Sequence, residues 1–266
     1  MLLTFSWWDA LLLVAISLHA TTIAYVSNPR HKTVILTLPI PFTMAALALG
    51  SKVEITHVVG LINLLLYTYS VRFLHQQKKL NIIASIALSV LLYIALGAMG
   101  KLLLPRDPVS FWLAGVFVMT MGAWMHFTRK HHNEPGQRSP LPLPIKLPAV
   151  MGVVSMLIVI KNLLGGFAAT FPMVGSIASY EMRRCLSTNC QAQPLTMMIA
   201  TPLMLTCRIA QDFMPLPAAL ALGWVASLTA IALLIPGYLK QQGIAAPESE
   251  PALAAVPVEV ESEPDV

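Results

Sequence analysis

One apolar stretch decides the class of fold: residues 80–103 read LNIIASIALSVLLYIALGAMGKLL, twenty-four residues with a single charged side chain, Lys101. An α-helix rises about 1.5 Å per residue, so this stretch would extend over about 36 Å. The hydrocarbon core of a bilayer is about 30 Å thick. The stretch therefore predicts a helix that spans a membrane.

The composition of the whole chain agrees with this prediction. Of its 266 residues, 56% are hydrophobic and 11% are charged, whereas a soluble domain carries about 25% charged residues. A soluble globular protein is therefore excluded. Apolar runs of spanning length use most of the chain, which leaves no room for a sizeable domain outside the membrane.

Similar runs recur along the chain and predict an all-α integral membrane protein with about nine transmembrane helices. The expected helices cover residues 5–26, 33–50, 55–73, 80–103, 108–127, 147–164, 167–181, 194–213 and 216–239. The chain is thus expected to divide into a first transmembrane half (1–127), a polar cytoplasmic linker (128–146), a second transmembrane half (147–240) and a disordered acidic tail (241–266).

The number of spans depends on residues 147–180, which are interrupted only by Lys161, Asn162 and the pair Gly165-Gly166. As a single helix these residues would extend over about 51 Å, well beyond the thickness of the hydrocarbon core. A helical hairpin that turns at the two glycines is therefore favoured, and it gives nine spans. The alternative, one long span followed by a re-entrant segment, gives eight.

Basic residues in the short loops predict the orientation. Twelve of them fall on one side of the expected helices: Arg30, Lys32, Arg72, Lys78, Lys79, Arg129, Lys130, Arg138, Lys146, Arg183, Arg184 and Lys240. The opposite side has Lys52, Lys101, Arg106 and Arg208. We therefore expect a multi-pass protein of a bacterial plasma (inner) membrane, with its N-terminus outside and its C-terminus cytoplasmic. The excess of bases indicates contact with the lipid bilayer and no role with nucleic acid.

Two segments of the chain are weakly alike. Residues 37–41 read TLPIP and residues 170–174 read TFPMV, and small residues follow both. Downstream, Arg72 and Arg208 end similar tripeptides, and the expected helices one to four would correspond to helices six to nine. An offset of five spans inverts the second copy, and inverted repeats are typical of secondary transporters. The alternative is a chance likeness between two apolar sequences.

The proline segments supply most of the candidate solute-binding residues. A proline inside a span removes a backbone hydrogen bond, so Pro39, Pro41 and Pro172 are expected to leave carbonyl groups facing protein, water or a ligand. Thr37 and Thr170 would add polar hydroxyls to the same lining. The alternative is that these prolines only kink their helices and that the threonines bond to their own backbone.

Polar and ionisable residues within spans are functional candidates because their burial is costly. His19 is expected to relay a proton or bind the solute, and Lys161 with Asn162 would favour an anionic group. The alternatives are a neutral histidine bonded to a neighbouring helix and a lysine that reaches the interface. Arg208 and Asp212 stand four residues apart, the spacing of a salt bridge on a helix.

No sequence motif names a reaction. The chain has no Walker A sequence, no G-x-S-x-G and no H-E-x-x-H, so we expect no enzyme activity, no cofactor and no metal site. The leading hypothesis is a secondary permease for a small anionic or zwitterionic solute. The alternatives are a membrane scaffold or accessory subunit, and an enzyme acting on lipid-linked substrates. A homo-oligomer or a membrane partner protein is compatible with each of these hypotheses.

Overall fold

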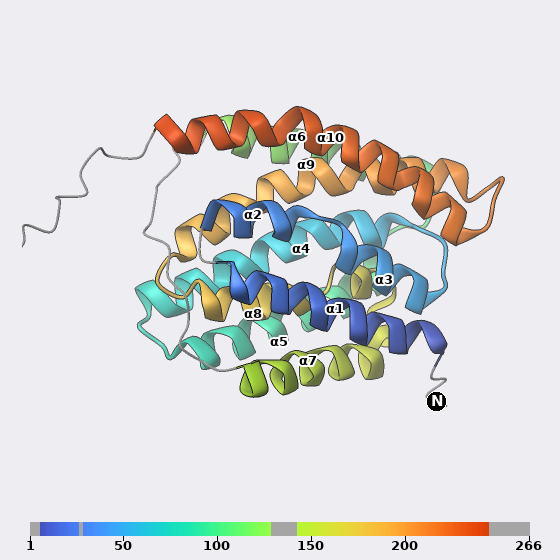
Figure 1. Ribbon diagram of the computed structural model, residues 1–266. Coiled ribbons are helices and arrows are strands. Elements are labelled where there is room, and N and C mark those ends of the chain that lie inside the picture. Colours follow the sequence, from blue (N-terminus) through green and yellow to red (C-terminus); the bar gives the residue numbers. More distant parts are fainter. Residues whose placement is uncertain (1–5, 27–28, 129–142, 245–266) are drawn as a thin grey trace, which may run out of the picture.

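The computed structural model describes residues 6–26, 29–128 and 143–244. Every regular element among them is a helix, so the all-α class is confirmed. The helices run roughly along one common direction and form a single bundle (Figure 1).

Seven helical segments of the described residues are long and apolar enough to cross a membrane. They are Trp7–Tyr25, His31–Leu49, Ile55–Gln77, Ile82–Leu103, Pro108–Thr128, Val150–Thr170 and Leu216–Lys240. The chain therefore has the helices that a multi-pass membrane protein requires. The count of nine spans is not confirmed, because the seventh and eighth expected helices are not among these segments.

The uninterrupted helices are α1 (Trp7–Tyr25), α4 (Ile55–Arg72), α5 (Ile82–Leu103), α6 (Pro108–Thr128), α9 (Leu186–Ala210) and α10 (Leu216–Ile244), and the π-helix η1 (Phe73–Gln77) extends α4. Short polar side chains begin several of them. Ser6 and Asp9 form a capping box on α1, and the side chain of Asn81 accepts from the Ile83 N–H at 3.0 Å at the start of α5. Hydrogen bonds from Ser110 to Asp107, in the loop before α6, lower the pKa of that carboxyl.

Two segments are broken helices. The first consists of α2 (Pro29–Thr37) and α3 (Ile40–Leu49), which are separated at Leu38 and Pro39. The second consists of α7 (Leu143–Leu164), the 3₁₀-helix η2 (Gly165–Thr170) and α8 (Met173–Glu181). The chain turns where expected between α7 and η2, at Gly165, whose φ of 57° is in the left-handed region that favours glycine.

After this turn the chain follows α4. Gly166 lies against Thr56 and His57, and Thr170 lies against Gly60. Further along, Ser176 is within hydrogen-bond distance of the Tyr67 hydroxyl. Successive residues of the second broken segment thus contact successive residues of α4, so the two run side by side in the same direction. This arrangement inserts η2 and α8 into the bundle, where eleven of their fifteen residues are buried.

Helix α9 is the most deeply buried long helix, with seventeen of its 25 residues buried. It packs against α10, α6, α4 and α2, and Figure 1 shows it beside α6 and α10. The prediction of a helix at 194–213 is wrong at both ends, because α9 begins at Leu186 and ends at Ala210. Its only charged side chain is Arg208, so its polar uncharged residues, not its charge or length, exclude it from the apolar spans.

Polar contacts tie the loops together at the end of the bundle where α1 begins. Gln211 exchanges two hydrogen bonds with the backbone of Val53, at 2.8 and 3.0 Å. The expected salt bridge between Arg208 and Asp212 is confirmed at 3.4 Å, and Lys52 joins it at 3.3 Å. The loop after α3 is therefore held to the loop after α9.

The expected linker and tail are described only in part. Helix α7 begins at Leu143, so residues 143–146 of the expected linker are helical, and residues 129–142 lie outside the described residues. Helix α10 continues to Ile244, which makes residues 241–244 helical as well. Residues 245–266 of the expected tail also lie outside the described residues.

Gly60 should be intolerant of a side chain. A Cβ atom at this position would collide with the Thr170 side chain, whereas a Cβ at Gly152 in α7 would meet nothing within 4 Å. We expect Gly60→Ala to lower the free energy of unfolding by about 1–3 kcal/mol through overpacking. Thermal unfolding of the purified protein in detergent measures this, with Gly152→Ala as the control. Equal melting temperatures for the two variants would contradict the close approach of α4 and η2.

Candidate functional site

The two helix breaks have the same local structure. Pro39 is the N-cap of α3 with φ −78° and ψ 27°, and Pro172 is the N-cap of α8 with φ −75° and ψ 49°. Four residues further on, each helix has a hydroxyl side chain, Thr43 in α3 and Ser176 in α8. The weak likeness between the two sequences thus corresponds to a likeness in conformation.

The carbonyl group of each capping proline accepts two hydrogen bonds. The Pro39 carbonyl accepts from the N–H and the hydroxyl of Thr43, at 3.0 and 2.8 Å. The Pro172 carbonyl accepts from the N–H and the hydroxyl of Ser176, at 2.9 and 2.7 Å. These two carbonyls are therefore not available to a ligand.

An aromatic side chain completes each of these hydrogen-bond chains. The indole N–H of Trp224 in α10 donates to the Thr43 hydroxyl at 2.9 Å. The hydroxyl of Tyr67 in α4 donates to the Ser176 hydroxyl at 3.3 Å. Because each serine or threonine then donates its own proton to a proline carbonyl, each break is fixed to a neighbouring helix.

Each proline lacks the N–H that would bond to the carbonyl four residues before it. Two of these three carbonyls accept a hydrogen bond from another N–H group. Pro39 cannot donate to Ile35, but the Leu38 N–H does so at 3.2 Å. Pro172 cannot donate to Ala168, and the Phe171 N–H takes that place, also at 3.2 Å. Pro41 cannot donate to the carbonyl of Thr37, four residues before it. The expectation of freed carbonyls therefore holds best for Thr37.

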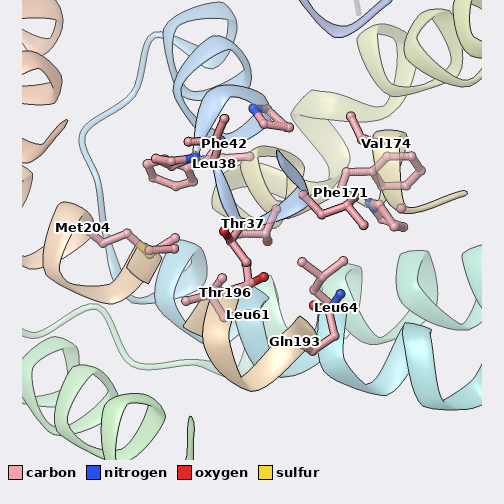
Figure 2. Close-up of a pocket in the computed structure, with 18 residues that line it drawn as sticks. Thr37, Leu38, Phe42, Leu61, Leu64, Phe171, Val174, Gln193, Thr196 and Met204 are labelled. Carbon is pink, nitrogen blue, oxygen red and sulfur yellow. The ribbon is translucent and has the colours of Figure 1, made fainter. Parts of the chain in front are cut away.

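The two breaks meet at one cavity of about 80 Å³ (Figure 2). Five of the residues predicted to bind solute line it: Thr37, Pro39, Pro41, Thr170 and Pro172. The remaining wall comes from α2, α3, α4, η2, α8, α9 and the two breaks: Leu36, Leu38, Phe42, Leu61, Leu64, Ala169, Phe171, Val174, Gly175, Gln193, Thr196, Ala200 and Met204. None of these eighteen side chains carries a charge.

Gln193 is the polar lining residue that the sequence prediction missed. Its side chain is 9% exposed and has no hydrogen bond to the part of the chain that the structure describes. In Figure 2 it lies at the cavity beside Leu64, with Thr196 one turn further along α9. The sequence does contain a signal, because Asn189, Gln193 and Thr196 have the spacing of one helical face.

The N-terminal turns of α3 and α8 line the cavity through Pro41, Phe42, Val174 and Gly175. The first helical bond of α3 is donated by Thr43 and that of α8 by Ser176. The N–H groups of Phe42, Val174 and Gly175 therefore have no acceptor within their own helices. Together with the positive ends of the two helix dipoles, these donors favour a negatively charged group.

Lys161 and Asn162 are not at this cavity. They line a second one, of about 400 Å³, with Ser6, Trp8, Leu47, Ala48, Leu49, Gly50, Leu216 and Pro217. The Lys161 ammonium group donates to the Asp9 carboxylate at 2.6 Å and to the Ala48 carbonyl at 3.0 Å. This buried ion pair links α1, α3 and α7. A solute-binding role for Lys161 stays a prediction, and any anion there would compete with Asp9.

His19 lines neither cavity. It is buried in α1, and its Nε2 atom has no hydrogen-bond partner within the described part of the chain. A role in proton relay stays a prediction. Among the described residues no group of three His, Cys, Asp or Glu side chains is arranged to hold a metal ion.

The Asp9–Lys161 pair should be important for stability as a unit. Removing one partner of a buried ion pair leaves an uncompensated charge and costs about 3–5 kcal/mol, whereas replacing both is much less costly. We expect Asp9→Asn and Lys161→Met each to lower the melting temperature strongly, and the double variant to recover most of the loss. A double-mutant cycle on purified protein measures the coupling. Additive losses in the double variant would contradict a direct pair.

Compared with known proteins, the chain matches no protein-family model, no curated protein and no solved structure. The function must therefore be argued from the geometry and chemistry of the site itself.

Proposed function

We propose that the protein is a secondary permease that moves a small anionic or zwitterionic solute across the membrane. The observation that carries this proposal is the meeting of two proline-capped half-helices at one cavity, whose mostly apolar wall includes the polar side chains of Thr37, Thr170, Gln193 and Thr196. Discontinuous helices whose N-termini face a shared cavity are a recurrent way for transporters to bind solutes without charged side chains.

The proposal includes an inverted repeat, in which α1 to α5 correspond to α7 to α10. The matching proline caps and hydroxyl bonds at Pro39 and Pro172 support it. The positions of Arg72 and Arg208 also support it. Arg72 ends α4, whereas Arg208 contacts Asp212, which pairs with Lys52 just before α4 begins. Equivalent residues at opposite ends of the bundle are what an inversion requires.

The proposed mechanism is alternating access about the cavity. The solute would bind where α3 and α8 begin, and one repeat would rock against the other to expose it to each side in turn. The polar contacts at the end where α1 begins, among them the Asp9–Lys161 pair, would have to rearrange when that side opens. We place the opposite end, with Arg72 and Arg183, in the cytoplasm of a bacterial cell, in keeping with the positive-inside rule.

Flux into liposomes tests the proposal. Purified protein reconstituted in liposomes should take up at least one labelled solute from a panel of small carboxylates and amino acids. We expect Pro39→Ala and Pro172→Ala to lower this flux at least tenfold, because a continuous helix would remove N–H donors from the cavity. Pro236→Ala is the matched control, since Pro236 is an exposed proline inside α10. Flux equal to that of empty liposomes across the panel, with folded wild-type protein, would overturn the proposal.

A truncation separates a permease from a scaffold. Residues 245–266 carry six of the twelve acidic residues of the chain, and a scaffold that recruits partners through this segment would lose its activity without it. A permease that works through the central cavity should retain most of its flux. The measurement is liposome uptake by the protein that ends at Ile244. No uptake by either protein, together with a partner that the full chain recovers and the truncated chain loses, would favour the scaffold.

A further inference from the structure

We propose that the central cavity takes a small zwitterion, an amino acid of the size of glycine or alanine, in preference to a simple anion. This inference rests on the proposed function, because it names the solute of the same site. It follows from the balance of donors and acceptors around the cavity and from the absence of charge among the eighteen lining side chains.

The carboxylate end of such a solute matches the donors. The N–H groups of Phe42, Val174 and Gly175, which have no acceptor in their own helices, lie at the positive ends of two helix dipoles. The amide of Gln193 adds a side-chain donor that is nine-tenths buried and that bonds to no other described residue. Its amide atoms are not fully enclosed, so a ligand in the cavity can reach them. A bound carboxylate would accept a hydrogen bond from the amide N–H.

The ammonium end matches the acceptors. The hydroxyl of Thr37 donates to the Val34 carbonyl at 2.8 Å, and the hydroxyl of Thr196 donates to the Ala192 carbonyl at 3.0 Å. Because their protons are used, both oxygens face a ligand only as acceptors. The Thr37 carbonyl, deprived of its helical donor by Pro41, is a third acceptor. The ammonium group therefore has acceptors without the carbonyls of Pro39 and Pro172, which are already bonded.

Net charge decides between an anion and a zwitterion. An anion would bring an uncompensated charge into a cavity without any cationic side chain, which is costly inside a membrane protein. The buried cation of Lys161 lines the other cavity and is already paired with Asp9. A zwitterion has no net charge. Its carboxylate can accept from the N–H donors, and its ammonium group can donate to the oxygen acceptors.

The size and the wall of the cavity limit the side chain of the bound amino acid. A volume of about 80 Å³ holds only a few non-hydrogen atoms. Leu38, Phe42 and Leu61 provide an apolar wall next to the polar groups. Hydrogen or methyl on the carbon between the two charged groups suits this wall, and a charged or long side chain does not.

Three matched ligands test the inference on the full chain in lipid nanodiscs. Alanine carries both charges, propionate is alanine without the ammonium group, and ethylammonium is alanine without the carboxylate. At equal ionic strength and pH 7 we expect calorimetry to show alanine or glycine binding at least tenfold more tightly than the other two. Propionate binding as tightly as alanine, or no binding of either amino acid, would overturn the inference.

Two pairs of variants locate the ligand. Gln193→Leu removes the amide at the cavity, and Gln191→Leu is its control on the same helix, outside the cavity lining. Val174→Pro removes one N–H from the first turn of α8, where proline is tolerated, and copies the Pro-x-Pro pattern of residues 39–41. Val174→Ala keeps the N–H. We expect Gln193→Leu and Val174→Pro each to weaken alanine binding about tenfold, as loss of a bond to a charged group does.

The outcomes for the permease and for its solute are distinguishable. Tight alanine binding that depends on Gln193, without any flux, would support the zwitterion site and overturn the permease. Flux of propionate but not of alanine would support the permease and overturn the zwitterion. Alanine affinity unchanged in folded Gln193→Leu and Val174→Pro proteins would also overturn the site, because the ligand would then lie elsewhere.

Discussion

Within a bilayer no water is available to satisfy a backbone group that has lost its partner, and this constraint governs the centre of the bundle. Two helices are interrupted there by proline, and each interruption could leave carbonyl groups without donors. The structure solves the problem in the same way twice. The carbonyl of the capping proline accepts from the N–H and the hydroxyl of the residue four positions later, Thr43 or Ser176.

This solution connects local conformation to the packing of distant helices. Trp224 and Tyr67 donate to the two hydroxyls, so the breaks are joined to α10 and α4. Tyr93 in α5 adds a further contact, because its hydroxyl donates to the Phe167 carbonyl at 2.8 Å beside Thr170. Among the described residues, the N–H groups of Phe42, Val174 and Gly175 remain without an acceptor in their own helices. The same feature that stabilises the breaks therefore leaves donors for a ligand.

The burial of α9 is the second condition for a polar centre. Polar residues such as Asn189 and Thr201 lie inside the bundle on this helix, bonded to neighbours at 3.3 and 2.7 Å. Gln193 lies on the same helix but has no such bond within the described residues, and it faces the cavity. A helix of this composition would be poorly placed against lipid. Surrounded by α4, α6 and α10, it can bring an amide to the two broken helices.

The sequence by itself determined the helical class, most helix positions, the turn at Gly165 and the local likeness between the segments of Pro39 and Pro172. These follow from hydropathy, glycine conformation and proline chemistry, which act over a few residues. The sequence placed α9 incorrectly and missed Gln193, because polar residues such as Gln191 and Gln193 resemble a loop when only hydropathy is considered. Only the tertiary structure decided that Lys161 pairs with Asp9 and that Gln193 lies at the cavity with no hydrogen bond to another described residue. Both depend on contacts between residues far apart in the chain, and such contacts are fixed by packing, not by local pattern.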